Sequence, residues 1–416
     1  MDLIIDNIEE AIVNTKKQLK SALPDLKEIF KDVEHYISEE VSIIEASIHE
    51  GKSVIPEILY QDIENGNIDL DTIDLVKKRG CVVIRNVFSK SLIDEWNEDL
   101  GKYIIENGYY EQCQGKAHLD QYFSSLQASK PQVFGIYWSK PQVKARQDKA
   151  MAKTKAWLNN LWVYEKDGNT VFDPNKECTY ADRIRRREPG DSTFGLSPHS
   201  DAGSVERWID KGYQKVYRHI FNGNWNDYDP FDASHRTEIS EIPSPAVSHV
   251  FRTFQGWTAL TEQGSNDGTL QLIPIVKNMV YILYRSLLDD VPDDSLCGAL
   301  PGRALNTSPE WHALSLKALV SIPLLYPGDT VWWHPDITHA VEDVHIGNNY
   351  SNVMYIGSSP LCKKNNDYLT IQGERFLKGE SAPDFSDENY EVSYLNRATM
   401  DDLSDLGKKQ MGFVPW

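Results

Sequence analysis

The sequence predicts a mainly β protein with helical additions, and three observations support this fold class. Between about residues 180 and 360, short β-branched or aromatic runs such as DRIRRREPG, GTLQLIPIV and NVMYIGSSP alternate with Gly, Pro, Asn and Asp, as strands alternate with turns. Residues 5–47 instead repeat apolar side chains every three or four positions, which indicates helix. The 416-residue chain has 40% hydrophobic and 25% charged residues, an ordinary globular composition, so a folded core is expected.

The N-terminal arm is expected to contain two amphipathic helices. Its apolar residues include Ile12, Leu19, Val33 and Ile44, separated by Lys, Glu and Asp. Pro24 lies in the middle, and proline removes a backbone donor and clashes with the preceding turn, so the helix should break there. The apolar stripe predicts a packing surface, and a homodimer through these helices is one way to cover it.

Helix, strand and helix should follow the arm in close order. Residues 72–78 predict a short helix, the apolar run at 79–88 a buried strand, and the next segment a helix that Ser89 caps. Residues 140–165 predict one long helix from their apolar spacing. Two apolar runs within 250–278, joined by an acidic Asn/Gly-rich turn, predict an antiparallel hairpin.

These elements divide the chain into an arm at residues 1–70 and one domain at residues 71–416. The β core of this domain should cover about 180–362. Residues 363–416 are rich in Pro, Gly and acidic side chains and have weak periodicity, so we expect them to wrap the core as loops and short helices. The Trp-, Tyr- and Asn-rich stretch at 204–249 is expected to cover the mouth of a pocket.

An excess of acidic residues narrows the choice of partners. The chain has 62 acidic and 43 basic residues, a formal net charge of −19 and a pI near 5.0, and such a field repels phosphate backbones and anionic lipids. We therefore expect no nucleic acid and no membrane partner. The first residues are acidic where a signal peptide is basic, which predicts a cytoplasmic protein. The five cysteines form no CxxC pair, which predicts reduced, buried thiols.

The first pattern that could form a reactive or metal-binding site is His199-Ser200-Asp201, within GLSPHSDAGS. On a strand, residues two apart point to the same face, so the imidazole and the carboxylate would enter one cavity together. Composition alone produces such a pair often enough that a solvated turn remains the alternative.

The second pattern is PGDTVWWHPDITHAV, in which a Pro-Gly-Asp turn leads into an aromatic strand. Pro335 breaks this strand, His339 begins the next apolar run, and His334 competes with His339 for any chemical role. Two imidazoles and one carboxylate on one face are ligands of non-haem Fe(II), and they leave positions open for a cosubstrate and dioxygen. Either histidine alone could instead be a core residue with a satisfied ring.

The order of these patterns resembles a known family. An HxD pair, a WTAL strand, the GTLQLIPIVK run, a Gly-Asp turn with a strand and a histidine, and a last strand NVMYIGSS are similar to the phytanoyl-CoA-dioxygenase-like branch of the Fe(II)/2-oxoglutarate oxygenases. Further segments, among them CVVIRNVF, ERW, YDP, HRTE, CGALPGR and WWHPDITHAVE, resemble the YbiU-like family over roughly residues 15–410. The resemblance implies a double-stranded β-helix (jelly-roll) core flanked by helices.

The resemblance also implies ligands and cofactors. The metal would be Fe(II), held by His199, Asp201 and His339, the cosubstrate would be 2-oxoglutarate, and His334 would be a core residue or support a ligand. Trp257 corresponds to a tryptophan that lines the cosubstrate pocket, although an ordinary core indole is an equal alternative. The implied function is oxidation of a small-molecule substrate by dioxygen, in most cases hydroxylation, with release of succinate and CO2.

One departure from this branch concerns the far carboxylate of 2-oxoglutarate. The branch places an arginine soon after the distal histidine, whereas HIGNNYSNVMY contains neither Arg nor Lys. We expect Arg252 to bind this carboxylate instead, because a guanidinium suits a carboxylate and Arg252 lies on the strand that leads to Trp257. Strict alternation would separate these two residues, so a bulge at Gly256 is predicted.

Other residues could bind the far carboxylate of 2-oxoglutarate, and other functions are possible. Arg185 is the second choice for the carboxylate, on a strand face shared with Arg183 and Arg187, and a polar clamp of Tyr350, Ser351 and Asn352 is the third. A catalytically silent jelly-roll binding protein is possible because a fold does not imply a function, although the intact ligands argue against it. The absent arginine alone favours a cupin-like iron enzyme that does not use 2-oxoglutarate.

Overall fold

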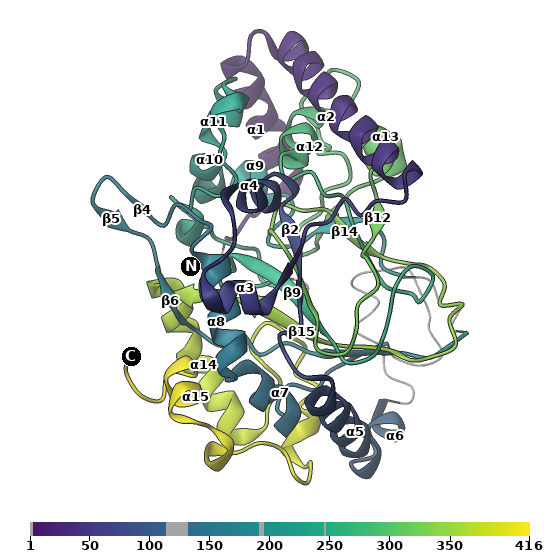
Figure 1. The fold of residues 1–416 in the computed structure, drawn as a ribbon. Coiled ribbons are helices and arrows are strands. Elements are labelled where there is room, and N and C mark those ends of the chain that lie inside the picture. The colour runs from purple at the N-terminus through teal and green to yellow at the C-terminus, as the bar shows by residue number, and fades with distance from the viewer. Residues whose placement is uncertain (1–2, 114–131, 191–194, 245–246) are drawn as a thin grey trace.

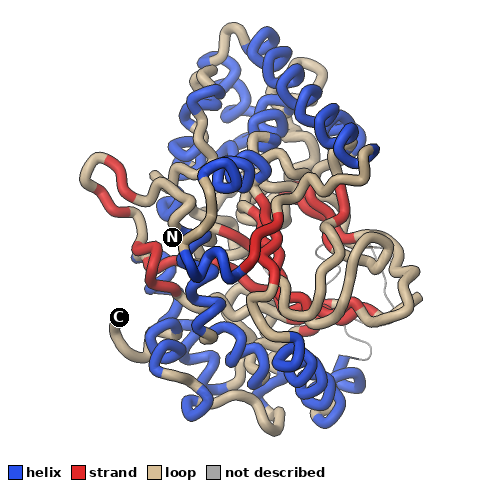
Figure 2. The backbone as a smooth tube through the Cα atoms, in the orientation of Figure 1, coloured by secondary structure: helices blue, strands red, loops and turns tan. Residues whose placement is uncertain are grey.

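The computed structural model describes residues 3–113, 132–190, 195–244 and 247–416, and over these residues the chain forms a mixed α/β structure. Two main sheets occupy the middle of the molecule, and helices gather at two opposite ends (Figures 1 and 2). Helices account for more of the described residues than strands do. The expectation of a mainly β protein is therefore wrong in its proportions, because the strands are short and several segments between them form helices.

The larger sheet has seven strands, and every neighbouring pair is antiparallel except β1 with β2. In spatial order the strands are β1 (Glu57–Leu59), β2 (Cys81–Arg85), β13 (Thr330–Trp333), β9 (Phe254–Ala259), β15 (Ser351–Ser358), β7 (Ile184–Arg187) and β3 (Val133–Phe134). β9 and β13 are buried along their whole length, including the polar Gln255, Thr258 and Thr330. β2 confirms the strand predicted within 79–88.

The smaller sheet has five strands, all antiparallel to their neighbours. In spatial order they are β11 (Leu305–Asn306), β8 (His199–Ser200), β14 (His339–Val341), β10 (Leu270–Leu272) and β12 (Val320–Ser321). The hairpin predicted within 250–278 is wrong, because β9 and β10 belong to different sheets and the segment between them carries the chain from one sheet to the other. Two small ribbons pair β6 (Asp173–Glu177) with β16 (Pro360–Leu361), and β4 (Glu165–Lys166) with β5 (Asn169–Thr170).

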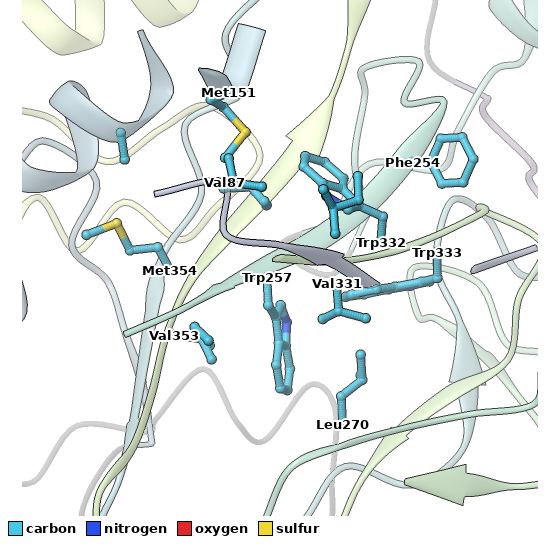
Figure 3. Close-up of a cluster of buried hydrophobic side chains, with 14 of the residues drawn as sticks. Val87, Met151, Phe254, Trp257, Leu270, Val331, Trp332, Trp333, Val353 and Met354 are labelled. Atoms are coloured by element: carbon cyan, nitrogen blue, oxygen red, sulfur yellow. The ribbon is translucent and has the colours of Figure 1, made fainter. Parts of the chain in front are cut away.

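The two sheets share a hydrophobic core (Figure 3). Trp257 of β9 and Val331 of β13 point to the side of the larger sheet on which Leu270 of the smaller sheet lies. Trp332 points to the opposite side, where Met151 of α8 (Lys149–Asn159) packs. Alternation along each strand therefore buries one set of side chains between the sheets and the other set under helices.

The helices form two groups (Figure 1). The group that includes the arm contains α1 (Ile8–Ala22), α2 (Leu26–His49), α9 (Glu206–Ile209), α10 (Lys211–Val216), α11 (Arg218–Phe221), α12 (Asn278–Arg285) and α13 (Pro309–Leu316). The other group contains α5 (Lys90–Glu106), α6 (Tyr109–Cys113), α7 (Lys140–Arg146), α8, α14 (Lys363–Lys378) and α15 (Asp405–Gln410), while α3 (Tyr60–Asn65) and α4 (Leu70–Arg79) lie between the groups. Within the described ranges no helix has the length and apolar content that a bilayer crossing requires.

The arm forms two helices separated at Pro24, as the sequence predicts. The apolar stripe packs on helices of the same chain: α2 packs on α12 and α13, where Phe30 stacks on Tyr281 with ring centroids 5.4 Å apart, and α1 packs on α9. A buried ion pair between Glu40 and Arg79, 3.0 Å apart, also ties α2 to α4. The stripe is therefore covered within one chain, and the homodimer through the arm stays a prediction, as does the boundary between arm and domain.

The helices around β2 follow the prediction, but the next helix does not. α4 ends at Gly80, and Ser89 caps α5 by accepting a hydrogen bond from the Leu92 amide at 3.4 Å. The single helix predicted at 140–165 is wrong, because Asp148 begins a second helix there and accepts a hydrogen bond from a backbone amide of its first turn. All five cysteines are buried and free, as predicted.

The C-terminal segment contains a longer helix than the sequence predicts. α14 has 16 residues, which corrects the expectation of loops and short helices for the start of 363–416. Its buried face mixes Tyr368, Leu369 and Phe376 with the polar Gln372, so the apolar periodicity is too weak to be recognised. Loops and short helices follow it, as expected.

Candidate metal centre and its cavity

Two histidines and one aspartate meet where β8 and β14 run side by side. His199 is the first residue of β8, Asp201 directly follows that strand, and His339 is the first residue of β14. The two histidines are opposite each other in the antiparallel pair, and opposite residues point to the same face of a sheet. Pro335 lacks an N–H and follows β13, so the chain leaves the larger sheet and begins β14 at His339.

The three side chains have the separations of ligands around one common point. Asp201 Oδ1 lies 3.7 Å from His199 Nε2, and Asp201 Oδ2 lies 3.8 Å from His339 Nε2. All three ligand atoms lie within 4.8 Å of one another, and the two imidazole centroids are 4.2 Å apart. The structure therefore brings together the three residues that the sequence predicts as ligands.

Backbone carbonyls orient both imidazoles. His199 Nδ1 lies 2.6 Å from the Ser197 carbonyl oxygen and His339 Nδ1 lies 3.5 Å from that of Ile337, so each ring can donate from Nδ1 and keep Nε2 for a metal. Burial, assisted by the neighbouring imidazole, lowers the pKa of His339 to about 3, so this ring is neutral at pH 7. A neutral ring with a free Nε2 lone pair is the form that binds metals.

The carboxylate also suits a cation. Burial alone would raise the pKa of Asp201, but the imidazoles and the guanidinium groups of Arg252 and Arg183 outweigh it and keep the pKa below its ordinary value. Oδ1 of this carboxylate is buried and accepts no hydrogen bond from any residue in the described ranges, and an unsatisfied buried charge is costly. Two imidazoles and a carboxylate that lacks a donor fit a divalent ion such as Fe(II).

His334 has a different environment, which supports the assignment of His339 as the ligand. It is fully buried, its Nε2 lies 3.0 Å from the Pro230 carbonyl oxygen, and its Nδ1 accepts from the Asp336 amide at 3.0 Å. Its ring stacks on Trp162 with centroids 4.7 Å apart. Both ring nitrogens are therefore occupied within the core.

A cavity of about 80 Å³ opens beside the three ligands, with room for several water molecules. Both main sheets line it, through β9, β13 and β15 of the larger and β8 and β14 of the smaller. Its wall includes Tyr180, Asp182, Arg183, Val247, Ser248, Arg252, Gln255, Trp257, Tyr355, Asp384 and Phe385. The sequence predicts Arg252 and Trp257 in this wall, but it gives no signal for Gln255 or for Asp384 and Phe385 of the C-terminal segment.

A family model described as Gig2-like matches residues 6–413. The chain belongs to the Gig2-like family. The protein YbiU of Escherichia coli K12 is 41% identical over 404 residues, which are 97% of this chain and 96% of that protein. The resemblance to the YbiU-like family is thereby confirmed.

Two solved structures are similar to this Gig2-like chain over nearly its whole length. One, from Salmonella typhimurium LT2 and named "Putative Oxidoreductase", has 39% identity and a TM-score of 0.94, with 99% of each chain covered. The other is GlcNAc Inducible Gene 2 of Candida albicans, with 28% identity and a TM-score of 0.82, covering 100% of this chain and 91% of that chain.

Arg252 reaches the cavity of this Gig2-like protein without the predicted bulge. β9 pairs with β13 and β15 in unbroken register, so the bulge at Gly256 is wrong; Arg252 precedes the strand, and strand alternation does not apply to it. Its stem crosses Gly357, where an added methyl group would lie 3.1 Å from Arg252 Cδ. Its guanidinium lies 5.1 Å from the ring centroid of Tyr180 and forms no hydrogen bond or ion pair with the described residues.

The other predicted clamps have other surroundings. Arg185 lies over the Trp257 ring at 5.6 Å, donates to the Gly268 carbonyl at 3.0 Å, and is not part of the cavity wall. Arg187 donates to two backbone carbonyls at 2.6 Å each, whereas Arg183 lines the cavity and pairs with Asp182 at 3.2 Å. Arg183, Arg185 and Arg187 therefore have different partners, and only Arg183 lines the cavity.

The remaining candidates lie away from the cavity. Ser351 donates to Gln263 at 2.9 Å, Asn352 donates to Asn97 at 3.1 Å, and Tyr350 is exposed, and none of the three lines the cavity. The stretch 204–249 forms helices of the arm's group, and among its described residues only the last ones reach the cavity wall. The expectation that this stretch covers the pocket mouth is therefore wrong for most of its length.

Proposed function

We propose that this protein is a non-haem Fe(II)- and 2-oxoglutarate-dependent oxygenase that oxidises a small-molecule substrate with dioxygen, in the manner of the phytanoyl-CoA-dioxygenase-like branch. One observation carries the proposal: two buried histidines and the partly buried Asp201 open onto a cavity whose wall includes Arg252. Among the described residues, Asp201 Oδ1 accepts no hydrogen bond and the Arg252 guanidinium has no hydrogen-bond or ion-pair partner. The donor set suits Fe(II), and the arginine suits an anionic cosubstrate.

The strand order supports a double-stranded β-helix core. β7, β9, β13 and β15 belong to the larger sheet, in the order β13-β9-β15-β7, and β8, β10, β12 and β14 belong to the smaller, in the order β8-β14-β10-β12. Eight strands that exchange between two antiparallel sheets in this way are the pattern of a jelly roll. The other strands and the helices are additions to this core.

The residues around the cavity would have different roles in this reaction. His199, Asp201 and His339 would hold Fe(II), which with 2-oxoglutarate and dioxygen supplies oxidative decarboxylation to succinate and CO2 coupled to oxidation of a substrate. Hydrogen bonds from the imidazole Nδ1 atoms keep the rings in the ligating tautomer. The apolar wall around Trp257 and Phe385 excludes water from the bound substrate.

Arg252 is the proposed partner of the far carboxylate of 2-oxoglutarate. Fe(II) at one end of the cavity and the Arg252 guanidinium in its wall would each provide a positive charge for one carboxylate of 2-oxoglutarate. Gln255 lies beside Arg252 in the wall, and its Nε2 is a buried donor without an acceptor among the described residues. A carboxylate between these two side chains would accept from both.

Anaerobic titration of the Fe(II)-loaded protein with 2-oxoglutarate tests this proposal. We expect about one equivalent to bind with a new visible charge-transfer absorption, and admission of air to release succinate. Iron binding without 2-oxoglutarate binding would instead indicate an iron enzyme of the cupin type. Absence of iron binding would indicate a catalytically silent binding protein. His339→Ala, which removes one ligand, is the control for adventitious iron.

A further inference from the structure

A buried guanidinium joins the two segments that carry the predicted metal ligands. Arg207 lies on α9 and is fully buried. Its Nη2 donates to the Asp201 carbonyl at 2.7 Å and to the Pro335 carbonyl at 3.3 Å, and its Nε donates to the Gly203 carbonyl at 3.0 Å. One side chain thus bonds both the turn that follows β8 and the turn that leads from β13 to β14.

The turn after His199 requires such support. Ala202 has φ of 63° and Gly203 has φ of 102°, so the chain takes a left-handed conformation directly after Asp201. A residue with a Cβ rarely adopts this conformation without tertiary contacts that hold it. The two carbonyl groups that Arg207 bonds, those of Asp201 and Gly203, flank Ala202 on both sides.

Asp336 anchors Arg207 from the other segment. This fully buried carboxylate accepts from Arg207 at 2.7 Å, Tyr217 at 2.9 Å, Tyr228 at 2.7 Å and Arg236 at 2.8 Å. Two guanidinium groups share one carboxylate, so the cluster buries one positive charge in excess, which is costly. An apolar cluster would fill the same space without that cost, which indicates that the charges have a task besides packing.

The cluster also includes residues from four segments that resemble the YbiU-like family, three of which had no chemical assignment. The segments ERW, YDP, HRTE and WWHPDITHAVE each contribute one of its members, namely Arg207, Tyr228, Arg236 and Asp336. The last segment also contains His339, three residues after Asp336. The cluster is therefore built around the chain segment that carries the distal ligand.

We propose that Arg207 is a positioning residue that holds Asp201 and His339 in the arrangement a metal requires. This inference rests on the metal site of the proposed function. Arg207 acts through the backbone of Asp201 and not on its carboxylate, because each of its bonds to this segment goes to a carbonyl oxygen. Hydrogen bonds that orient ligands in this way typically change metal affinity by roughly 10–100-fold when they are removed.

The test uses Co(II), whose visible absorption reports coordination geometry, and two variants of the full chain. Arg207→Met removes the bonds to both segments. Arg236→Met is the matched control, since it removes another buried guanidinium from the same carboxylate, one that forms no hydrogen bond with Asp201 or Gly203 among the described residues. We expect both variants to lower the melting temperature, and only Arg207→Met to weaken Co(II) binding at least about tenfold and to change the spectrum.

Two results would overturn the inference. One is a folded Arg207→Met protein with the parent's Co(II) affinity and spectrum, and the other is an equal loss of affinity in Arg236→Met. If Arg207→Met does not fold, Arg207→Lys decides, because lysine keeps the charge but cannot bond as a fork: weakened binding supports the inference and parent-like binding overturns it. A parent that binds Co(II) but not 2-oxoglutarate refutes the proposed function and leaves this test intact.

Discussion

The histidines of β8 and β14 and the arginines of β7 both extend into the protein interior from strands, but their surroundings differ. Each imidazole contacts a carbonyl through Nδ1 and directs Nε2 toward Asp201. Arg185 and Arg187 instead donate to the carbonyls of loops, at 3.0 and 2.6 Å. The histidines keep bonding capacity for a ligand, whereas these arginines hold loops in place. Residue spacing predicts which side chains share a face, but the backbone oxygens around them decide what they bind.

The largest expected effect is the loss of Fe(II) affinity when one of the two histidines opposite each other is replaced. His339→Ala should lower Fe(II) affinity by well over tenfold, because it removes one of the three proposed ligands. His334→Ala should keep the affinity within about threefold in folded protein, because both nitrogens of His334 are bonded in the core. Isothermal titration under anaerobic conditions measures both. Loss of iron binding in His334→Ala together with retention in His339→Ala would reverse the assignment.

Only part of the proposed ligand set could be predicted from local sequence patterns. His199 and Asp201 are two residues apart at a strand, so a short pattern brings them together, whereas the choice of His339 over His334 came from the resemblance to a family. The support of these ligands could not be predicted in this way. Arg207 and Asp336 meet across 129 residues, and nothing in either segment indicates its partner.

The second effect concerns 2-oxoglutarate affinity and compares an arginine of the cavity wall with an arginine of β7. Arg252→Leu should raise the dissociation constant for 2-oxoglutarate at least tenfold and leave iron affinity nearly unchanged, because a charge-assisted pair contributes roughly 1.5–3 kcal/mol. Arg185→Leu should mainly destabilise the fold, because this side chain supports the Gly268 carbonyl and not the cavity wall. Equal 2-oxoglutarate affinity in the parent and Arg252→Leu would transfer the role to another cavity residue, with Arg183 next to be tested.

The wall that includes Arg252 shows why the rest of the site was harder to predict. The sequence indicates Arg252 through charge and proximity to Trp257, but the route of its side chain depends on Gly357 of β15, a strand that is distant in the sequence. Asp384 and Phe385 come from the C-terminal segment, whose weak periodicity hides even the helix α14. Strands and caps follow local rules, whereas a cavity wall is assembled from segments that meet only in the folded chain.

The third effect concerns the pH dependence of stability and one histidine outside the site. Burial lowers the pKa of His334 to about 3, so the folded state binds fewer protons at this ring than the unfolded chain does between about pH 6.5 and pH 3. The free energy of unfolding should therefore fall as the pH falls through this window, by up to about 1.4 kcal/mol per pH unit from this ring. Urea denaturation at pH 7, 6 and 5 should show a shallower dependence for His334→Gln.

A His334→Gln protein whose stability falls as steeply as the parent's would show that other groups cause the loss.

The smallest effect on the site is expected from the arm. Ile44 is fully buried on α2 while its neighbour Ile43 is 46% exposed, so the two residues form a matched pair. Ile44→Ala should lower the free energy of unfolding by about 2–5 kcal/mol because it leaves a cavity under the arm, whereas Ile43→Ala should change it by less than about 0.5 kcal/mol. Neither variant should alter Fe(II) affinity, since α2, which carries both residues, packs on α12 and α13 and the arm contributes no residue to the cavity wall within the described ranges. Gel filtration of the same variants tests the predicted homodimer. If the exposed side of α2 forms the dimer interface, Ile43→Ala should shift the parent's dimer toward monomer. A parent protein that elutes as a monomer would exclude the homodimer. A large loss of iron affinity in folded Ile44→Ala would show instead that the packing of the arm affects the proposed metal site.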